Sequence, residues 1–175
     1  LEVIKQFSDQ GNVASTMINL GGVYIDTKEY DKALAIFDQA LKIAEGLEDE
    51  PRLANIWGNY GFIYLKQQKY TESLHYSRKA LEVFEKNNNG YAIIIGLSNV
   101  GQALLGQGKV KEGIGFCDKS LTMAIEFGAT LEQIEACNCV YTGYKSQGNL
   151  AKALEYHERL LIYTFLWFST ENNKR

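Results

Sequence analysis

Three asparagines stand at one regular interval in this chain, and their side chains are suited to binding another molecule. Asn19, Asn59 and Asn99 are equally spaced, and Cys139 occupies the next position of the series. A carboxamide offers two N–H donors and a carbonyl acceptor, so it can hold the backbone of an extended peptide without selecting one side chain. The alternative is that these asparagines form hydrogen bonds with neighbouring helices and contact no ligand.

The residue types that most often perform catalysis are not spaced for it. The two histidines, His75 and His157, stand far apart in the chain, and no His-x3-His or His-Glu-x-x-His segment occurs. The glycines at 106–108 follow no predicted strand, which excludes a phosphate-binding loop. The carboxylates at 48–50 stand in a polar segment and are expected to be solvated. The pattern therefore predicts no enzyme, no cofactor and no metal site.

The three cysteines, Cys117, Cys137 and Cys139, make an odd number, which suits a reducing compartment better than a disulfide framework. Cys137 and Cys139 are two apart on a predicted helix, about 200° around its axis, so they cannot bind one metal together. Cys117 and His157 share a repeat position with Phe37, so we expect Cys117 to be structural and His157 to be a core or semi-buried residue. We see neither a leader nor a run of ~20 apolar residues, and we expect a cytoplasmic protein without membrane insertion.

Composition indicates an all-α protein with no strongly charged partner. The chain is 46% hydrophobic, contains one proline, and has few of the alternating runs that strands require. Its net charge of −3 comes from 18 basic and 21 acidic residues without a basic block. Nucleic acid and anionic membrane are therefore disfavoured as main partners.

The elements that must position the asparagines recur with the same interval. A leucine also returns at this interval, and each copy contains two apolar stripes of helical spacing separated by a short polar break. Two antiparallel helices per copy are therefore expected, with each copy burying its apolar face against the next. The leucines are Leu1, Leu41, Leu81, Leu121 and Leu161.

We interpret the chain as one solenoid domain cut from a longer protein, because its first residues align with the second helix of later copies. The expected segments are a remnant second helix (1–12), repeat 1 (13–50), repeat 2 (51–90), repeat 3 (91–129), repeat 4 with an apolar terminal helix (130–168) and a tail (169–175). Gly113 and Gly115 should make the second helix of repeat 3 the softest, because glycine costs about 1 kcal/mol against alanine in a helix.

The repeated residues resemble the tetratricopeptide repeat, whose signature begins W-x2-L-G-x2-Y and continues with Ala and Phe. Tyr141 occupies the glycine position of the fourth copy, which predicts a more open helix pair there. The matching segments are Met17-Leu20-Gly21-Tyr24 with Ala33, Phe37 and Ala40; Trp57-Tyr60-Gly61-Tyr64 with Ala80; and, more weakly, Gly101 with Gly113 and Cys117.

The resemblance implies a right-handed superhelix with a concave groove that binds protein or peptide ligands. The interval between copies is longer than the period of about 34 residues that is usual for this repeat. It is similar to that of kinesin light chains, LGN and Pins scaffolds, Rap regulators, and repeat domains of bacterial sensor kinases and nucleotide cyclases. The groove residues that the resemblance implies are Ser15, Asn19, Asp26, Asn55, Asn59, Phe62, Lys66, Ser98, Asn99, Gln102, Asn138, Thr142 and Lys145.

The last predicted helix is apolar on every face over residues 160–168, so another surface is expected to cover it. It could form a homodimer or connect to a further domain through Leu161, Ile162, Phe165, Leu166, Trp167 and Phe168.

Taken together, the sequence predicts a non-enzymatic peptide-binding scaffold, as the sensory or regulatory domain of a larger bacterial signalling protein. Two alternatives stay open, namely a structural dimerisation module with an unused groove and a Rap-like regulator of a response regulator.

Overall fold

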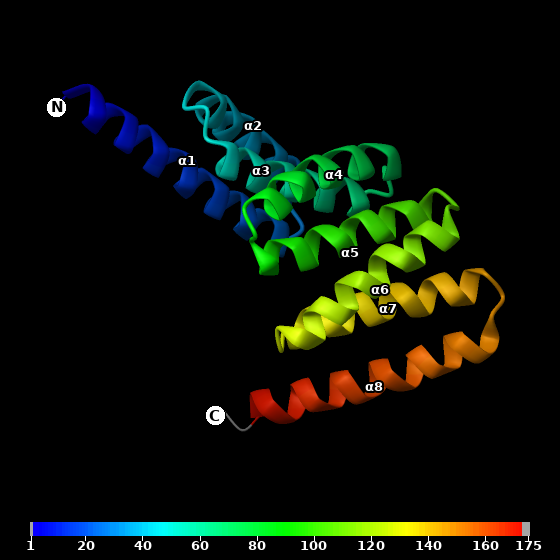
Figure 1. Ribbon diagram of the computed structural model, residues 1–175. Coiled ribbons are helices and arrows are strands. Elements are labelled where there is room, and N and C mark those ends of the chain that lie inside the picture. Colours follow the sequence, from blue (N-terminus) through cyan, green and yellow to red (C-terminus); the bar gives the residue numbers. More distant parts are fainter. Residues whose placement is uncertain (1, 173–175) are drawn as a thin grey trace.

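The computed structural model describes residues 2–172, and the side chains of residues 9–170. These residues form eight helices and no strand, which confirms the all-α solenoid of antiparallel helix pairs. Figure 1 shows the helices in one row, with α1 and α8 at its two ends. The helices are α1 (Glu2–Asp26), α2 (Tyr30–Gly46), α3 (Glu50–Lys66), α4 (Tyr70–Lys86), α5 (Gly90–Gly106), α6 (Val110–Glu126), α7 (Thr130–Ser146) and α8 (Leu150–Asn172).

Each connection between helices is the same three-residue turn. In the first turn the Glu29 N–H donates to the Tyr24 carbonyl over 2.8 Å, and the Lys28 N–H donates to the Ile25 carbonyl over 2.9 Å. This is the Schellman arrangement, in which the middle residue adopts the left-handed conformation. The equivalent pair of bonds occurs in all seven described turns. The residues with positive φ are equally spaced, at half the repeat interval: Lys28, Glu48, Gln68, Asn88, Gly108, Gly128 and Gly148.

The expected separate helix over residues 1–12 is not seen, because α1 continues without a break from Glu2 to Asp26. The expected boundaries at 50, 90 and 129 lie within one residue of the starts of α3, α5 and α7, whereas that at 168 lies inside α8.

A glycine in each of the first three pairs lets its two helices approach closely. A Cβ atom added at any of these glycines would come within 2.4 Å of a side chain on the partner helix. The opposed side chains are Phe37 at Gly21 (2.4 Å), Ser77 at Gly61 (2.2 Å) and Cys117 at Gly101 (2.4 Å).

The fourth pair has no glycine at this position and accommodates the change through one side chain. The ring of Tyr141 lies 5.4 Å from that of His157, measured between centroids. His157 is exposed, so the expectation of a core or semi-buried histidine is wrong. The pair itself stays packed, since Tyr156 of α8 is 8% exposed and shares a core with α7. Cys117, in contrast, is fully buried as expected.

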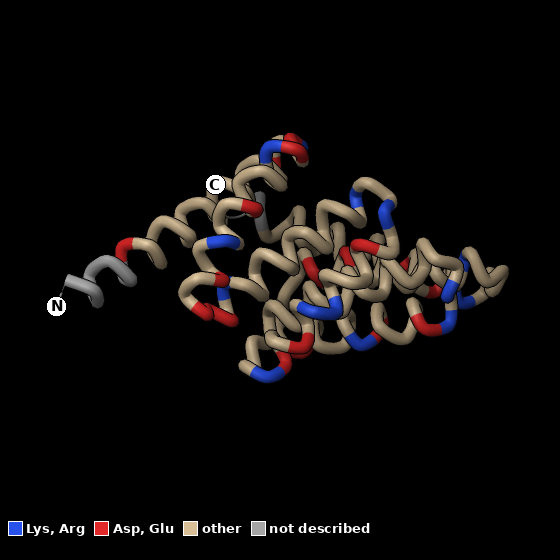
Figure 2. Tube along the Cα trace, turned by 90° about the horizontal axis from the view of Figure 1, so that it is seen from above, with Lys and Arg blue, Asp and Glu red and all other residues tan. Residues whose placement is uncertain are grey.

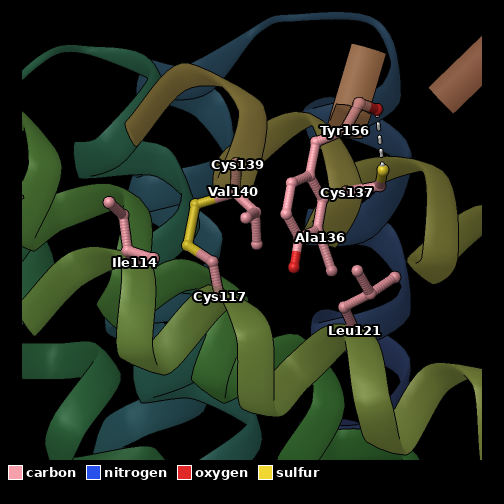
Figure 3. Close-up of a cluster of buried hydrophobic side chains, with 8 residues drawn as sticks. All are labelled: Ile114, Cys117, Leu121, Ala136, Cys137, Cys139, Val140 and Tyr156. Carbon is pink, nitrogen blue, oxygen red and sulfur yellow. Dashed lines mark hydrogen bonds between the residues drawn. A yellow bond between two sulfur atoms is a disulfide. The ribbon is translucent and has the colours of Figure 1, made fainter. Parts of the chain in front are cut away.

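The core is shared between neighbouring pairs rather than central. One cluster joins α6, α7 and α8 through residues such as Leu121, Val140 and Tyr156 (Figure 3). Another joins α2 and α3, where the Tyr60 hydroxyl also donates to Asp38 over 2.5 Å. Burial and the neighbouring Asp38 carboxylate raise the pKa of Tyr60, so its hydroxyl keeps its proton. Each pair therefore depends on the next for burial of its apolar face.

We predict opposite effects for two glycine substitutions in the third pair. In Gly101→Ala the new methyl would meet the Cys117 Sγ at 2.4 Å and the Gly113 carbonyl oxygen at 3.0 Å, so overpacking should lower the free energy of unfolding by about 1–3 kcal/mol. In the control, Gly115→Ala, nothing lies within 4 Å of the added atom. That control should gain up to about 1 kcal/mol from helix propensity. Urea unfolding followed by circular dichroism measures both, and equal effects would contradict the close approach.

Candidate functional site

The first helices of successive pairs form one face of the molecule, and this face contains two adjoining hollows. The first hollow has a volume of about 360 Å³ and is lined mainly by α1, α3 and α5. The second hollow, of about 410 Å³, is lined mainly by α3, α5 and α7. Both volumes are in the range of small ligand pockets. The uniform turns bring these helices into register, so that equivalent positions of successive copies line the same face.

The first hollow contains five of the predicted groove residues, two of them from the asparagine series. The Asn59 amide donates to the Asn55 carbonyl of its own helix over 2.9 Å, so part of its hydrogen-bonding capacity is already used. Asn99 is 5% exposed, and its carboxamide is not among the enclosed polar groups without a partner, which are those of Gln67 and Ser77. The predicted residues in this hollow are Asp26, Asn55, Asn59, Phe62 and Asn99.

The second hollow contains four further predicted residues, of which two are held by local hydrogen bonds. The Gln102 amide donates to the Ser98 hydroxyl over 3.1 Å, and the Thr142 hydroxyl donates to the Asn138 carbonyl over 2.8 Å. The predicted residues here are Lys66, Gln102, Asn138 and Thr142.

Lys66 links the two hollows. Its ammonium lies 4.8 Å from the ring centroid of Phe62, which lines the first hollow. Desolvation raises the pKa of Glu135 on α7, and the Lys66 charge partly offsets this rise. The Lys66 charge therefore stands beside both hollows, and the other charged side chain that lines them is Asp26 of the first hollow.

Four predicted groove residues lie outside both hollows. Asn19 is exposed on α1, and Ser15 accepts a hydrogen bond of 3.1 Å from Arg52 Nε. Ser98 is 5% exposed beneath Gln102. Lys145 is exposed, with its ammonium 5.6 Å from the ring centroid of Tyr141.

Sequence reasoning missed the apolar floor of the first hollow. Ile25, Phe84 and Ile95 line it, whereas the residues predicted for the groove are mostly polar. A signal was present for one of them, since Ile95 stands one repeat interval after Asn55. Phe84 comes from α4 and could not be assigned to this face without the packing of the pairs.

The cysteines correct a second expectation. Cys117 of α6 and Cys139 of α7 form a disulfide with 5.8 Å between their Cα atoms, and only Cys137 is a free thiol (Figure 3). The odd number of cysteines thus reflects one bond and one thiol rather than three thiols. The Cys137 Sγ donates to the Tyr156 carbonyl over 3.3 Å, and burial raises the pKa of this thiol to about 11. It is therefore a poor nucleophile at neutral pH.

Two further properties bear on the kind of site. Among residues 9–170, whose side chains the structure describes, no three His, Cys, Asp or Glu side chains are grouped so that they could hold a metal ion. None of the described helices, α8 included, has the length and apolarity needed to cross a membrane.

The fold and the two hollows define a helical-repeat scaffold with a ligand-sized groove, and comparison with known proteins identifies its family. The model of the tetratricopeptide repeat matches residues 12–86 and 52–112. The chain belongs to the tetratricopeptide repeat family, whose domains are generally non-catalytic modules for protein interaction. No match was found among curated protein sequences.

Solved structures show the same fold at low sequence identity. Aspartyl phosphate phosphatase F from Bacillus subtilis has a TM-score of 0.77 at 18% identity, over 89% of this chain and 41% of that protein. A signal transduction ATPase with a tetratricopeptide repeat sensor from Pyrococcus horikoshii has a TM-score of 0.70 at 21% identity, over 97% and 27%. The apo form of RapI has a TM-score of 0.66 at 18% identity, over 98% and 48%. The chain thus spans less than half of each of these proteins.

Alkylation should distinguish the cysteines. With the pKa of Cys137 near 11, only about one thiol in a thousand is ionised at pH 8, so native protein should react slowly with iodoacetamide. Unfolding without reductant should raise the rate at least about tenfold and add a single adduct by intact mass spectrometry. Reduction should then add two more adducts. Three adducts before reduction would contradict the Cys117–Cys139 bond.

Proposed function

We propose that this chain is a protein- or peptide-binding scaffold whose ligand lies as an extended segment across the two hollows. The observation that carries the proposal is Asn99, which lines the first hollow, is only 5% exposed, and is not among the enclosed polar side chains that lack a partner, so its carboxamide is open to the hollow. A carboxamide that opens into a hollow has two N–H donors and a carbonyl acceptor available to a bound molecule. A ligand backbone could pair with these groups, because it offers both an N–H donor and a carbonyl acceptor.

The lining of the first hollow favours a ligand side chain that is apolar. Ile25, Phe62 and Ile95 provide apolar surface beside the carboxamides. Burial of one leucine-sized side chain there would contribute about 1.5–3 kcal/mol before ordering costs. Asp26 at one hollow and Lys66 at the other would favour a ligand whose charges are opposite at these two places.

Signalling is the biological setting that the comparisons support best. One structural neighbour is named for a tetratricopeptide repeat sensor, and another for a phosphatase that acts on aspartyl phosphate. We infer a sensory or regulatory domain of a larger signalling protein, in which ligand binding in the groove biases an output domain. A bacterial source and a cytoplasmic location stay predictions.

Two other functions compete with peptide binding. A regulator of a response regulator is favoured by the likeness to RapI and by Gln102, whose amide stands in the second hollow. A dimerisation module is favoured by α8, where Leu161, Ile162 and Phe165 are more than half exposed. Phe168 is likewise 54% exposed and Leu166 49%, whereas Trp167 is half-buried.

Selection from a displayed library of random peptides tests the groove. Peptides selected on the full chain should bind Asn99→Ala and Asn59→Ala about fivefold or more weakly, because each substitution removes a hydrogen bond of about 1 kcal/mol. Fluorescence polarisation with synthetic copies of the selected peptides measures the affinities.

The matched control is Gln39→Ala, which removes an exposed carboxamide on α2, away from both hollows. Its affinity for the same peptides should be unchanged. Peptides that bind all three variants as they bind the unmodified chain, or a selection that enriches none, would refute the proposed groove.

A further inference from the structure

A third hollow, which we call the outer groove, lies on the other side of α5 from the first hollow. It has a volume of about 680 Å³, and its walls come from α4 and α6. Ile93 and Leu97 of α5 form part of its floor, whereas Ile95 and Asn99 of the same helix line the first hollow. Residues two apart on a helix lie about 200° around its axis, so the two sets face in nearly opposite directions. The lining lies within residues 78–126, and the chain has further helix pairs on both sides of it.

The floor of the outer groove is the open edge of an apolar core. Leu81 and Leu97 belong to the cluster that joins α4 and α5, and they are 6% and 5% exposed. Ile93, Phe116 and Met123 pack against this cluster, are half-buried, and also line the groove. The core holds these side chains in place, so the apolar surface is formed before a ligand binds.

The corresponding gap one copy earlier, between α2 and α4, contains a larger side chain. Trp57 stands one repeat interval before Leu97 and packs against clusters that include residues of α2 and α4. The Lys79 ammonium lies over its ring, 3.7 Å from the centroid. Lys119, one interval after Lys79, lies 5.7 Å from the ring centroid of Phe116. The exchange of tryptophan for leucine therefore leaves space in the outer groove that a side chain of the protein occupies one copy earlier.

Carboxylates gather at one end of the outer groove. Glu82, Glu85 and Glu126 line it near the C-terminal ends of α4 and α6, which run in the same direction. The partial negative charge of helix C-termini adds to these carboxylates. In the preceding copy, Lys42 and Lys86 occupy the positions of Glu82 and Glu126. Acidic and basic residues are interspersed over the described chain as a whole (Figure 2), so the excess of carboxylates in the groove is local.

The other charged residues of the lining stand nearer the opposite end of the outer groove. Arg78 precedes Glu82 by about one turn of α4, and Asp118 and Lys119 precede Glu126 by about two turns of α6. The ion pairs among residues 9–170 include none of the three glutamates. The acidic end of the groove is therefore suited to a cationic partner.

We propose that the outer groove binds an amphipathic helix of a partner protein, with apolar side chains on the floor and Lys or Arg beside Glu82, Glu85 and Glu126. Lining residues 78–85 of α4 and 116–126 of α6 extend over about 10 and 15 Å, which corresponds to two or three turns of a bound helix. Helices bind apolar grooves through residues at three- and four-residue spacing. Opposite charges at one end would fix the direction of the bound helix. The groove is separate from the two hollows, so this partner would be additional to the peptide ligand proposed above.

Selection from a displayed library of amphipathic helices tests the outer groove. Each member has leucines at three- and four-residue spacing, and Lys, Glu or Ser at random in the polar positions of both ends. The unmodified chain should enrich helices with Lys at one end. Synthetic copies should bind Glu82→Lys/Glu126→Lys at least about tenfold more weakly in fluorescence polarisation, because attraction becomes repulsion at two places. This variant carries the lysines of the preceding copy, and selection on it should enrich Glu instead.

A second variant and two controls separate the groove from other surfaces. Leu97→Trp introduces the side chain found one copy earlier and should weaken binding of the same helices about tenfold or more. Circular dichroism should show that it stays helical. Glu72→Lys/Glu112→Lys makes the same charge change at exposed positions outside the lining. It should change the affinity less than about twofold, because distant exposed charges are screened. Asn99→Ala should bind the selected helices as the unmodified chain does.

Four outcomes overturn the proposal. The first is a selection that enriches no helix, and the second is equal binding to the unmodified chain and to Glu82→Lys/Glu126→Lys. The third is weaker binding to Asn99→Ala, which would place the helices in the first hollow. The fourth is self-association of the unmodified chain in sedimentation velocity that Glu82→Lys/Glu126→Lys abolishes, which would assign the groove to a second copy.

Discussion

The hydrogen bond that closes each turn, from the N–H of its third residue to a carbonyl five residues earlier, sets the geometry on which the rest of the structure depends. Because the same bond recurs at a constant interval, each helix between two turns has the same length and each reverses direction at the same phase. Glycines at 21, 61 and 101 then bring the paired helices close enough for one side chain to fill the gap. The regular spacing of turns and gaps brings the first helices into one row, and the two hollows are spaces between members of that row.

The asparagine series shows how one residue type at one repeat position can have three different environments. Asn19 is exposed on the helix at the end of the row, Asn59 lies half-buried in the middle, and Asn99 is almost fully buried. A hollow needs helices on both sides, so the position of a copy within the array decides whether its asparagine can face a ligand. The same reasoning applies to Leu121 and Leu161, which are identical in type and repeat position but are 2% and 58% exposed.

Departures from the repeat are accommodated locally and leave the array intact. Tyr141 replaces the expected glycine, and His157 turns outward while the rest of α7 and α8 keeps a shared core. Cys117 fills the gap opposite Gly101 and is also joined to Cys139 of the next helix, so the third and fourth pairs are connected covalently as well as by packing. Apolar burial across each seam is strong enough to tolerate such exchanges, because every pair contacts its neighbours along whole helices.

The sequence by itself determined the all-helical class, the antiparallel pairing, the repeat interval and the family, because apolar spacing and glycine positions are local properties that recur in each copy. It also led to nine of the groove residues that line the hollows. Only the tertiary structure decided that Phe84 of a second helix reaches the first hollow and that Cys117 meets Cys139. Each of these depends on contacts between different helices, and the periodicity of a single helix contains no information about them.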